Sequence, residues 1–231
     1  MGNLNHHQKD RVVVLLSAGL DSSFNLFKSS KLDEIVLALT FDYGQRAASK
    51  EIERAQALCE KLNIDHQVIS LPWFSQFQSS SLLNRNMKVP IGAQIQMDNI
   101  QASKDSAKSV WVPNRNGIFL NIAAGFAEAL GAQYVIPGFN IEEAQTFPDN
   151  SEAFMKALDH SFSFSTANQI QVKCYSHTMN KTGIVSEGKK LGMDFTQLWP
   201  CYHNNDHWCG ECESCQRFKR ALDQNSIEFK C

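Results

Sequence analysis

The chain has 231 residues, 43% of them hydrophobic, which suits one domain with a sizeable core, with or without a small appendage. Its formal net charge of −2 comes without any basic run, which argues against general nucleic-acid binding, because that depends on phosphate neutralisation by Lys and Arg. No apolar run approaches the ~20 residues that span a bilayer, and 1–10 is polar without the core of a secretory signal, so we expect a cytoplasmic protein that binds no membrane.

The segment 12–23 is the most informative part of the sequence. Residues 12–16 are apolar and mostly β-branched, which predicts a buried parallel strand, and a helix is expected to begin near Phe24. A strand, a tight glycine-containing turn and a helix N-terminus direct unpaired N–H groups and the helix dipole to one place. We therefore predict an anion site, with phosphate as the anion; an ordinary strand-to-helix turn is the alternative. The loop consists of Ser17, Ala18, Gly19, Leu20, Asp21, Ser22 and Ser23.

The loop lacks the spacing of the Walker loop and of the dinucleotide-binding G-x-G-x-x-G. It resembles S-G-G-x-D-S, the pyrophosphate loop of ATP pyrophosphatases, which release pyrophosphate on reaction at the α-phosphate of ATP. Ala18 stands where that motif has its first glycine. If the position needs a positive φ, an alanine there costs roughly 1 kcal/mol.

The chain then alternates strands and helices. The expected elements are a strand at 35–41, a helix at 49–62 with Cys59 in its core face, a strand at 65–71, a helix at 118–130 closed by Gly131, a strand at 134–136, a helix at 151–162, a strand near 170–174 and a helix at 181–191. This alternation predicts an α/β fold with a doubly wound, mainly parallel sheet that binds ligands at the carboxyl ends of its strands. The polar segment 72–110 is too long for a plain connection, so we interpret it as an excursion or lid over the site.

Four of the seven cysteines crowd near the C-terminus in the pattern C-x7-C-x2-C-x2-C. In a reducing compartment, thiols at this spacing favour one tetrahedral Zn²⁺, and a site of four cysteines has no open position for water, so the metal is expected to be structural. An iron–sulfur cluster is the alternative, and His203 and His207 in the long spacer are competing ligands. The predicted ligands are Cys201, Cys209, Cys212 and Cys215. The chain thus divides into an ATP-binding domain at 1–195 and a helical, knuckle-like zinc region at 196–231.

Six short segments resemble, in order, the motifs of the 7-cyano-7-deazaguanine synthase family. They read SAGLDS at 17–22, TFDYGQR at 40–46, VPNRN at 112–116, FPD at 147–149, NKT at 180–182 and WPCY at 199–202. The cysteine spacing is similar too, and the resemblance covers nearly the whole chain apart from 72–110. The chain is identified on this basis as a member of that family or a close paralogue, with the adenine nucleotide alpha hydrolase-like fold of the pyrophosphate-loop superfamily.

The resemblance implies an ATP-dependent ligase that acts on 7-carboxy-7-deazaguanine, in queuosine-type deazapurine biosynthesis. The substrate carboxylate attacks the α-phosphate of ATP, which gives an acyl-adenylate and pyrophosphate, and ammonia displaces AMP to form the amide. A second ATP activates the amide oxygen, whose loss leaves the nitrile. The implied cofactors are ATP with Mg²⁺, beside the structural Zn²⁺. Family members are often homodimers, which leaves a homodimer open.

The resemblance also implies roles for individual residues. The pyrophosphate is held by the loop residues Ser17, Ala18, Gly19, Leu20, Asp21 and Ser22, with Asp21 acting through Mg²⁺, and Asp42 lies near the nucleotide. Arg115 clamps phosphate, because its guanidinium fork matches phosphate oxygens, and Lys181 is a second phosphate contact. Asp21, Arg115 and Lys181 form the candidate catalytic set; a surface arginine and a solvated lysine are the alternatives for the last two. The expected substrate contacts are Gln45, Asn140, Phe147 and Asp149.

Some positions depart from the family pattern. Asn114 replaces a glycine, Pro200 replaces a serine, and Ser151 stands where an arginine suited to a carboxylate is usual. A paralogue that adenylates a deazaguanine acid and passes it to another amine, for example on a protein in antiphage defence, is therefore an alternative. A tRNA-modifying pyrophosphate-loop enzyme and an inactive nucleotide-binding module are further alternatives.

Overall fold

Short apolar segments form one parallel sheet in the computed structural model, which describes residues 9–92 and 108–228. The strands are β1 (Arg11–Leu15), β2 (Glu34–Asp42), β3 (His66–Ser70), β4 (Tyr134–Ile136) and β5 (Gln171–Val172). Their order is β3-β2-β1-β4-β5, and every neighbouring pair is parallel. The central strand β1 is buried on both faces: Val13 packs into one core, while Val12 and Val14 pack into the other.

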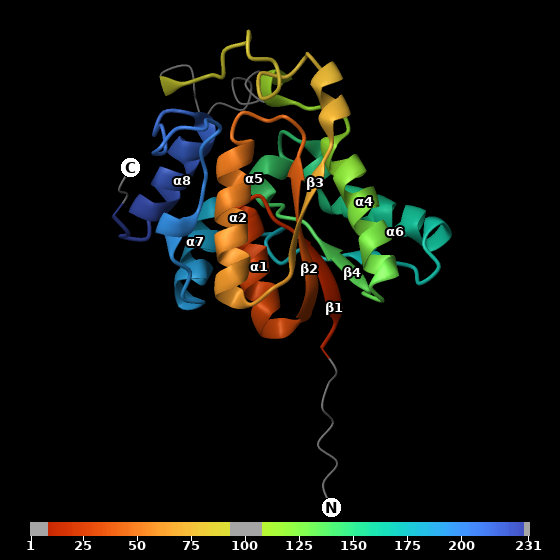
Figure 1. The fold of residues 1–231 in the computed structure, drawn as a ribbon. Helices are drawn as coiled ribbons and strands as arrows, with labels where there is room; N and C mark the ends of the chain where they lie inside the picture. Colours follow the sequence, from red (N-terminus) through yellow and green to blue (C-terminus); the bar gives the residue numbers. More distant parts are fainter. Residues whose placement is uncertain (1–8, 93–107, 229–231) are drawn as a thin grey trace, which may run out of the picture.

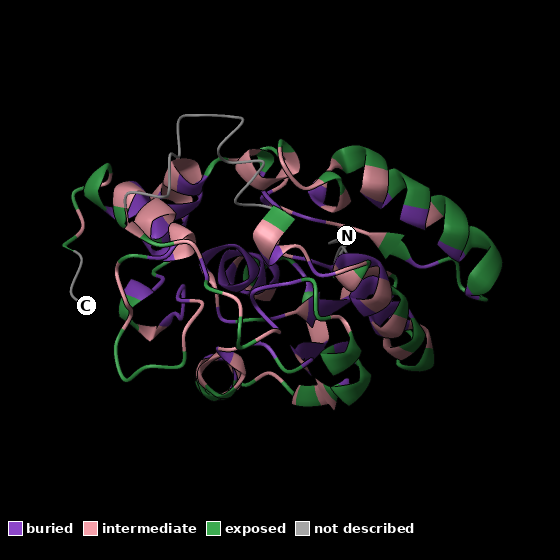
Figure 2. Cartoon of the chain, turned by 90° about the horizontal axis from the view of Figure 1, so that it is seen from above, coloured by how far each residue is buried: buried purple, intermediate pink, exposed green. Residues whose placement is uncertain are grey.

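Helices cover both faces of this sheet (Figure 1). They are α1 (Leu20–Leu32), α2 (Ala48–Leu62), α4 (Arg115–Ala129), α5 (Ile141–Ala144), α6 (Glu152–Ser165), α7 (Lys181–Lys190) and α8 (Glu213–Asp223). The side chains of α4 and α6 share one hydrophobic core with the sheet, and those of α1, α2, α7 and α8 share the other. Seen from above, buried residues gather between helices whose outer faces are exposed (Figure 2). The predicted doubly wound, parallel α/β architecture is confirmed.

Several element boundaries differ from the predictions, among them the end of α6, which is at Ser165 rather than at 162. Helix α1 begins at Leu20 rather than near Phe24, because Gly19 is the extended N-cap and the Leu20 side chain is already in the core. Helix α4 begins at Arg115 rather than at 118, since Asn114 takes a left-handed conformation and acts as the N-cap. The strand expected near 170–174 is only Gln171–Val172. The predicted strand at 134–136 has the observed bounds, and Gly131 after α4 has a φ of +66°.

The described parts of 72–110 lie over the carboxyl edge of the sheet (Figure 1). A 3-10 helix spans Pro72–Gln76. Beyond it, the Arg46 guanidinium donates hydrogen bonds to the carbonyl oxygens of Ser81 (2.7 Å), Asn84 (2.9 Å) and Met87 (2.6 Å). This one side chain therefore ties the segment to the loop between β2 and α2. Residues 93–107 of the predicted lid, the first eight residues and 229–231 lie outside the described part of the chain.

The C-terminal region packs against the main body. Phe218 and Leu222 of α8 belong to the same hydrophobic core as Leu26 of α1 and Leu58 of α2. Among the described residues, no helix combines the length and the hydropathy needed to cross a membrane.

Candidate active site

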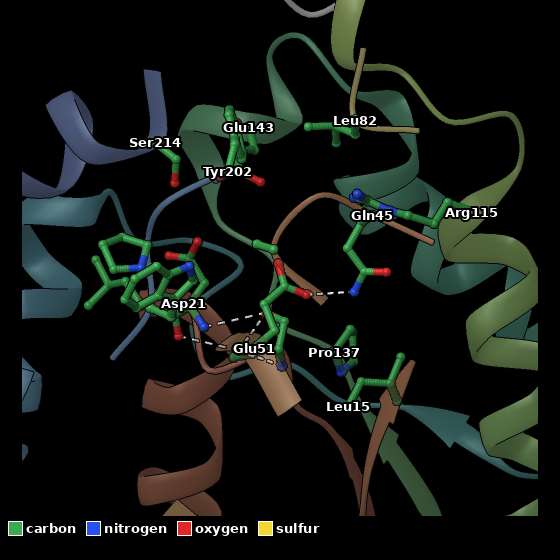
Figure 3. Close-up of a pocket in the computed structure, with 18 of the residues that line it drawn as sticks. Leu15, Asp21, Gln45, Glu51, Leu82, Arg115, Pro137, Glu143, Tyr202 and Ser214 are labelled. Carbon is green, nitrogen blue, oxygen red and sulfur yellow. Dashed lines mark hydrogen bonds between the residues drawn. The ribbon is translucent and has the colours of Figure 1, made fainter. Parts of the chain in front are cut away.

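A cavity of about 270 Å³ opens at the carboxyl ends of β1, β2 and β4 (Figure 3). In the sheet, β1 lies between β2 and β4. The chain passes from β1 to β2 on one side and later returns to form β4 on the other side, so the strand order reverses direction at β1. In open α/β sheets this is where ligands bind. The loops that follow β1, β2 and β4 line the cavity together with the N-terminal ends of α1, α4 and α7.

The loop at 17–22 closes on itself at the end of β1. The hydroxyl oxygens of Ser17 and Ser22 lie 3.1 Å apart, and the Ser22 hydroxyl donates to the Gly19 carbonyl at 3.3 Å. Ala18 has a φ of +56°, so the backbone position does require the conformation that glycine adopts freely, at a cost of about 1 kcal/mol. Its carbonyl oxygen accepts a hydrogen bond from the Trp199 amide at 2.8 Å, which fixes the loop against the C-terminal region.

Gly138, after β4, makes the close approach that assembles the site. A Cβ at this position would lie 2.5 Å from the Ser22 nitrogen and 2.7 Å from its Cα, so only glycine fits without a backbone shift. This contact places Asn140 and the short helix α5 beside the first turn of α1. Asn140 is the N-cap of α5 and accepts a hydrogen bond from the Glu143 amide at 2.9 Å.

Lys181 lies between two carboxylates at this junction. Its Nζ is 2.8 Å from Asp21 Oδ2 and 2.8 Å from Glu143 Oε1, and the residue is only 5% exposed. Burial acts to lower the pKa of Lys181, but Asp21 and Glu143 outweigh it and hold the pKa above its usual value, so the ammonium stays charged. A cation is disfavoured at a helix start, and the structure shows what compensates for it here.

The pKa values of the two carboxyl groups are shifted in opposite directions. Burial raises the pKa of Asp21 despite the opposing charge of Lys181. Burial also acts to raise the pKa of Glu143, but Lys181 outweighs it, so the pKa of Glu143 is lowered. The second oxygen of Asp21, Oδ1, is buried without a hydrogen-bond partner among the described residues. A buried carboxylate oxygen in this condition is suited to a cation or a donor that arrives with a ligand.

Arg115 reaches the cavity from the first residue of α4 (Figure 3). Its Nη1 lies 3.4 Å from the Tyr43 hydroxyl, and its Nε lies 3.3 Å from Asn116 Oδ1. Burial acts to lower the pKa of Arg115, but Tyr43, Asp149 and Glu143 raise it on balance, so the side chain is a cation. Within the described ranges it makes no ion pair, which leaves it available for an anion.

The expected substrate residues fall into two groups. Phe147 lines the cavity, and its ring is parallel to that of Trp111 with the centroids 6.1 Å apart. Gln45 also lines it, but its amide is engaged by its own loop: Oε1 accepts from the Tyr43 amide and Nε2 donates to the Phe41 carbonyl, each at 3.0 Å.

The remaining expected residues are not among those that line the cavity. Asp42 accepts a hydrogen bond from the Gly44 amide at 3.1 Å, and Asp149 accepts one from the Asn150 side chain at 3.1 Å. Neither of them, nor Asn140 or Ala18, lines the cavity itself. Ser17, Gly19, Leu20, Asp21, Ser22, Arg115 and Lys181 all do.

Sequence reasoning missed Glu51, in the first turn of α2. Its Oε2 accepts a hydrogen bond from Gln45 Nε2 at 2.8 Å inside the cavity (Figure 3). Burial raises the pKa of this carboxyl to about 7, against the opposing effects of the Gln45 hydrogen bond and of Arg115. Its spacing to the buried Ala55 and Leu58 was the available signal, because residues four and seven positions apart share a helix face.

The C-terminal cysteines form a cluster beside this cavity. The Sγ atoms of Cys201, Cys209, Cys212 and Cys215 all lie within 4.8 Å of one another, so these residues could hold a metal ion. Backbone amides donate hydrogen bonds to the cluster. Those of residues 203 and 209 each donate to the Cys201 sulfur at 3.4 Å. Within the described part of the chain, the histidines of the spacer do not belong to this cluster.

The comparisons with known proteins agree over nearly the whole chain. The family model described as "Queuosine biosynthesis protein QueC" matches residues 11–226. A 7-cyano-7-deazaguanine synthase of Bdellovibrio bacteriovorus is 54% identical over 95% of this chain and 96% of its own length. Enzymes of the same name from Carboxydothermus hydrogenoformans and Methanosarcina mazei are 44% and 42% identical over 94% of this chain, and over 100% and 96% of their own lengths.

Solved structures support the fold alone. An NMN synthetase from Francisella tularensis has a TM-score of 0.50 at 15% identity, covering 99% of this chain and 82% of its own. The U34-tRNA thiolase NcsA from Methanococcus maripaludis has a TM-score of 0.50 at 12% identity, covering 100% of this chain and 77% of its own. The fold is adenine nucleotide alpha hydrolase-like, and the chain belongs to the QueC family of queuosine biosynthesis enzymes.

Proposed function

We propose that this protein is an ATP-dependent ligase that converts 7-carboxy-7-deazaguanine and ammonia, through the amide, to 7-cyano-7-deazaguanine. The observation that carries the proposal is the Asp21–Lys181–Glu143 cluster at the end of the β1 loop, with Asp21 and Lys181 buried, in a chain of the QueC family. The cluster places charge where a pyrophosphate anion would lie against the N-terminus of α1. We place the reaction in the cytoplasm.

The pyrophosphate end of ATP fits the loop at 17–22. The first-turn amides of α1 have no intrahelical partner, so they can donate to phosphate oxygens, and the hydroxyls of Ser17 and Ser22 lie at the same edge. Lys181 contributes a fixed positive charge to the same place. Asp21 and Glu143 would hold Mg²⁺, because the buried Asp21 Oδ1 lacks a partner and hard cations prefer oxygen ligands. When bound, Mg²⁺ supplies charge neutralisation at the phosphates.

Activation of the substrate acid then needs charge stabilisation at the α-phosphate. Arg115 and Asp21 lie on opposite sides of the cavity in Figure 3, so the arginine approaches the nucleotide from the wall formed by α4. Its planar fork matches two phosphate oxygens. The carboxylate of the substrate attacks the α-phosphorus as pyrophosphate leaves, and the site contributes positioning and preorganised charge rather than a covalent intermediate with the protein. Phe147, against Trp111, offers an apolar face to the planar deazapurine ring.

We assign structural Zn²⁺ to the cysteine cluster. Four sulfurs at about 2.3 Å from a tetrahedral Zn²⁺ are about 3.8 Å apart from one another. The observed separations fit this arrangement, with Cys209 and Cys215 sulfurs 4.0 Å apart and the whole set within 4.8 Å.

A second candidate rests on Ser151. Its side chain accepts a hydrogen bond from the Phe154 amide at 3.2 Å and donates to the Pro148 carbonyl at 2.7 Å, so it caps α6 and offers no positive charge to a substrate carboxylate. A paralogue that transfers the adenylated acid to another amine, such as one on a protein, would tolerate this change.

Product analysis separates these candidates. Purified protein is incubated with Mg-ATP, 7-carboxy-7-deazaguanine and ammonium, and the products are identified by mass spectrometry. We expect the nitrile, with one AMP formed in each of its two activation steps. Adenylate or amide that accumulates without nitrile would favour the paralogue, and absence of AMP would contradict both.

A further inference from the structure

Glu51 differs from the other acidic residues of the described cavity wall in its lack of an ion pair. The described cavity wall contains five carboxylates, and four of them are in ion pairs: Asp21 and Glu143 with Lys181, Glu142 with Arg217 and Arg220, and Glu213 with Arg217. Glu51 makes no ion pair with any described residue. A carboxylate that no cation neutralises keeps its basicity.

The position of the Glu51 side chain is fixed. Its Oε2 accepts the hydrogen bond from Gln45, and Gln45 is itself held by the Tyr43 amide and the Phe41 carbonyl. No described group donates to Oε1, so one oxygen is anchored while the other faces the cavity (Figure 3). This is the geometry of a positioned proton acceptor.

The charged and titratable groups around Glu51 balance one another. Asp42 on β2 disfavours its ionisation, while Arg115 on α4 and the Gln45 amide favour it; Tyr43 also faces it and is kept neutral because burial raises its pKa. With a pKa of about 7, the Glu51 carboxyl both accepts and releases a proton near neutral pH.

We infer that Glu51 is the general base that removes protons from the substrate nitrogen, an inference that rests on the proposed function. The ammonia lone pair attacks the acyl carbon, a C–N bond forms, and the C–O bond to AMP breaks with its electron pair leaving on the phosphate. The nitrogen loses one proton in this step, to Glu51. After the amide oxygen is adenylated, the nitrogen loses its two remaining protons as the second AMP leaves, which forms the nitrile. Glu51 passes each proton to solvent before it accepts the next.

The test separates activation from proton transfer. In Glu51→Gln, the amide oxygen still accepts the Gln45 hydrogen bond, but the base is lost. We expect substrate-dependent exchange of labelled pyrophosphate into ATP, measured without ammonia, to stay within about twofold of wild type, since this half-reaction needs no base. Amide formation should fall by about 10²-fold or more. The matched control is Glu53→Gln on the solvent face of α2, which should change neither rate.

The pH profile and a substitute nucleophile complete the test. At a fixed concentration of free NH₃, which keeps the titration of ammonium out of the profile, amide formation by the wild type should fall as the pH drops below about 7, because protonated Glu51 cannot accept a proton. Glu51→Gln should lose this limb, and Glu51→Asp should retain it at a lower rate. Hydroxylamine, which is unprotonated at neutral pH, should restore part of the Glu51→Gln rate.

Two outcomes would overturn the inference. Unchanged amide formation in Glu51→Gln would show that the carboxylate moves no proton, and an equal loss of pyrophosphate exchange and amide formation would place Glu51 in nucleotide activation instead. A wild-type protein that shows no substrate-dependent exchange would contradict the proposed function itself, independently of Glu51.

Discussion

Lys181 shows how one side chain can combine burial, stability and function. Its two partners are a buried carboxylate in the first turn of α1 and a partly exposed one in α5, 160 and 38 positions away in the sequence. Removing one member of a buried ion cluster leaves uncompensated charge, which costs far more than the cluster contributes as a whole. Under the proposed function, the same charge would also face the phosphates of ATP.

Lys181→Met should therefore lower the free energy of unfolding by about 3–5 kcal/mol and abolish ATP-dependent turnover. Urea unfolding gives the first number. Lys156→Met is the matched control, because Lys156 forms an ion pair with Glu152 on the exposed surface of α6 and its removal should have no measurable effect. A loss as small as that of the control would show that the buried cluster is not a stabilising unit.

The raised pKa of Glu51 lowers the free energy of unfolding at alkaline pH. The folded pKa of about 7 lies above the ordinary glutamate pKa of 4.5, so wild-type stability is full below pH 4.5 and falls as the pH rises through 7. Glu51→Gln should be more stable than wild type at pH 8, by an amount on the order of 3 kcal/mol, and equal to it at pH 4. Denaturant unfolding at both pH values checks this, and a variant less stable than wild type at pH 8 would contradict it.

At the scale of elements, the junction of the β4 loop with α1 determines whether the site assembles. Gly138→Ala should lower the free energy of unfolding by about 1–3 kcal/mol and weaken ATP binding, because the new Cβ would overlap the Ser22 backbone. The matched change is Gly125→Ala in α4, where a Cβ meets nothing within 4 Å. That variant should gain about 0.5–1 kcal/mol. Thermal melts and nucleotide titrations measure both, and equal effects would exclude the overlap as the cause.

The elements were largely predictable because their signals are local. Short runs of apolar residues predict both the strand at 134–136 and the buried β1. Gly131 follows α4 with a positive φ, as expected for a residue that ends a helix. The predicted start of α1 was wrong. Residues 21–23 are of the types that cap helices, but the N-cap is the extended Gly19. The Lys181–Glu143 pair and the inward face of Glu51 depend on tertiary contacts, which no local pattern encodes.

Gln45 shows the same limit within the site. A motif match can place a side chain near the nucleotide, but the three hydrogen bonds that hold the Gln45 amide appear only when β2, its loop and α2 are folded together. In the structure its amide donates to Glu51, and its direct contact with substrate stays a prediction.

At the scale of the whole molecule, the cysteine cluster and the cavity are mechanically linked. Helix α8 contains Cys215 and is capped by Cys212. Its Arg217 contacts Glu142 at 3.3 Å, and Glu142 accepts a hydrogen bond from the Lys181 amide at 2.8 Å. A disturbance of the cysteine cluster can therefore reach the start of α7 through the side chains of Arg217 and Glu142.

Metal analysis of the purified protein should give one Zn²⁺ per chain and no visible absorbance. Cys212→Ser should lower the melting temperature and weaken nucleotide binding together, because it removes one of the four clustered sulfurs at the buried start of α8. A brown protein that contains iron would show that the cysteines hold an iron–sulfur cluster instead of zinc. Full nucleotide binding by the metal-free protein would contradict the proposed link between the cysteine cluster and the cavity.

The most direct measurement follows oxygen from the substrate into AMP. With 7-carboxy-7-deazaguanine labelled with ¹⁸O at both carboxylate oxygens, each activation step should transfer one labelled oxygen to phosphorus, so both AMP molecules formed per nitrile should carry one ¹⁸O. Unlabelled AMP would mean that ATP is cleaved by water rather than by the substrate, which would contradict adenylation at this site.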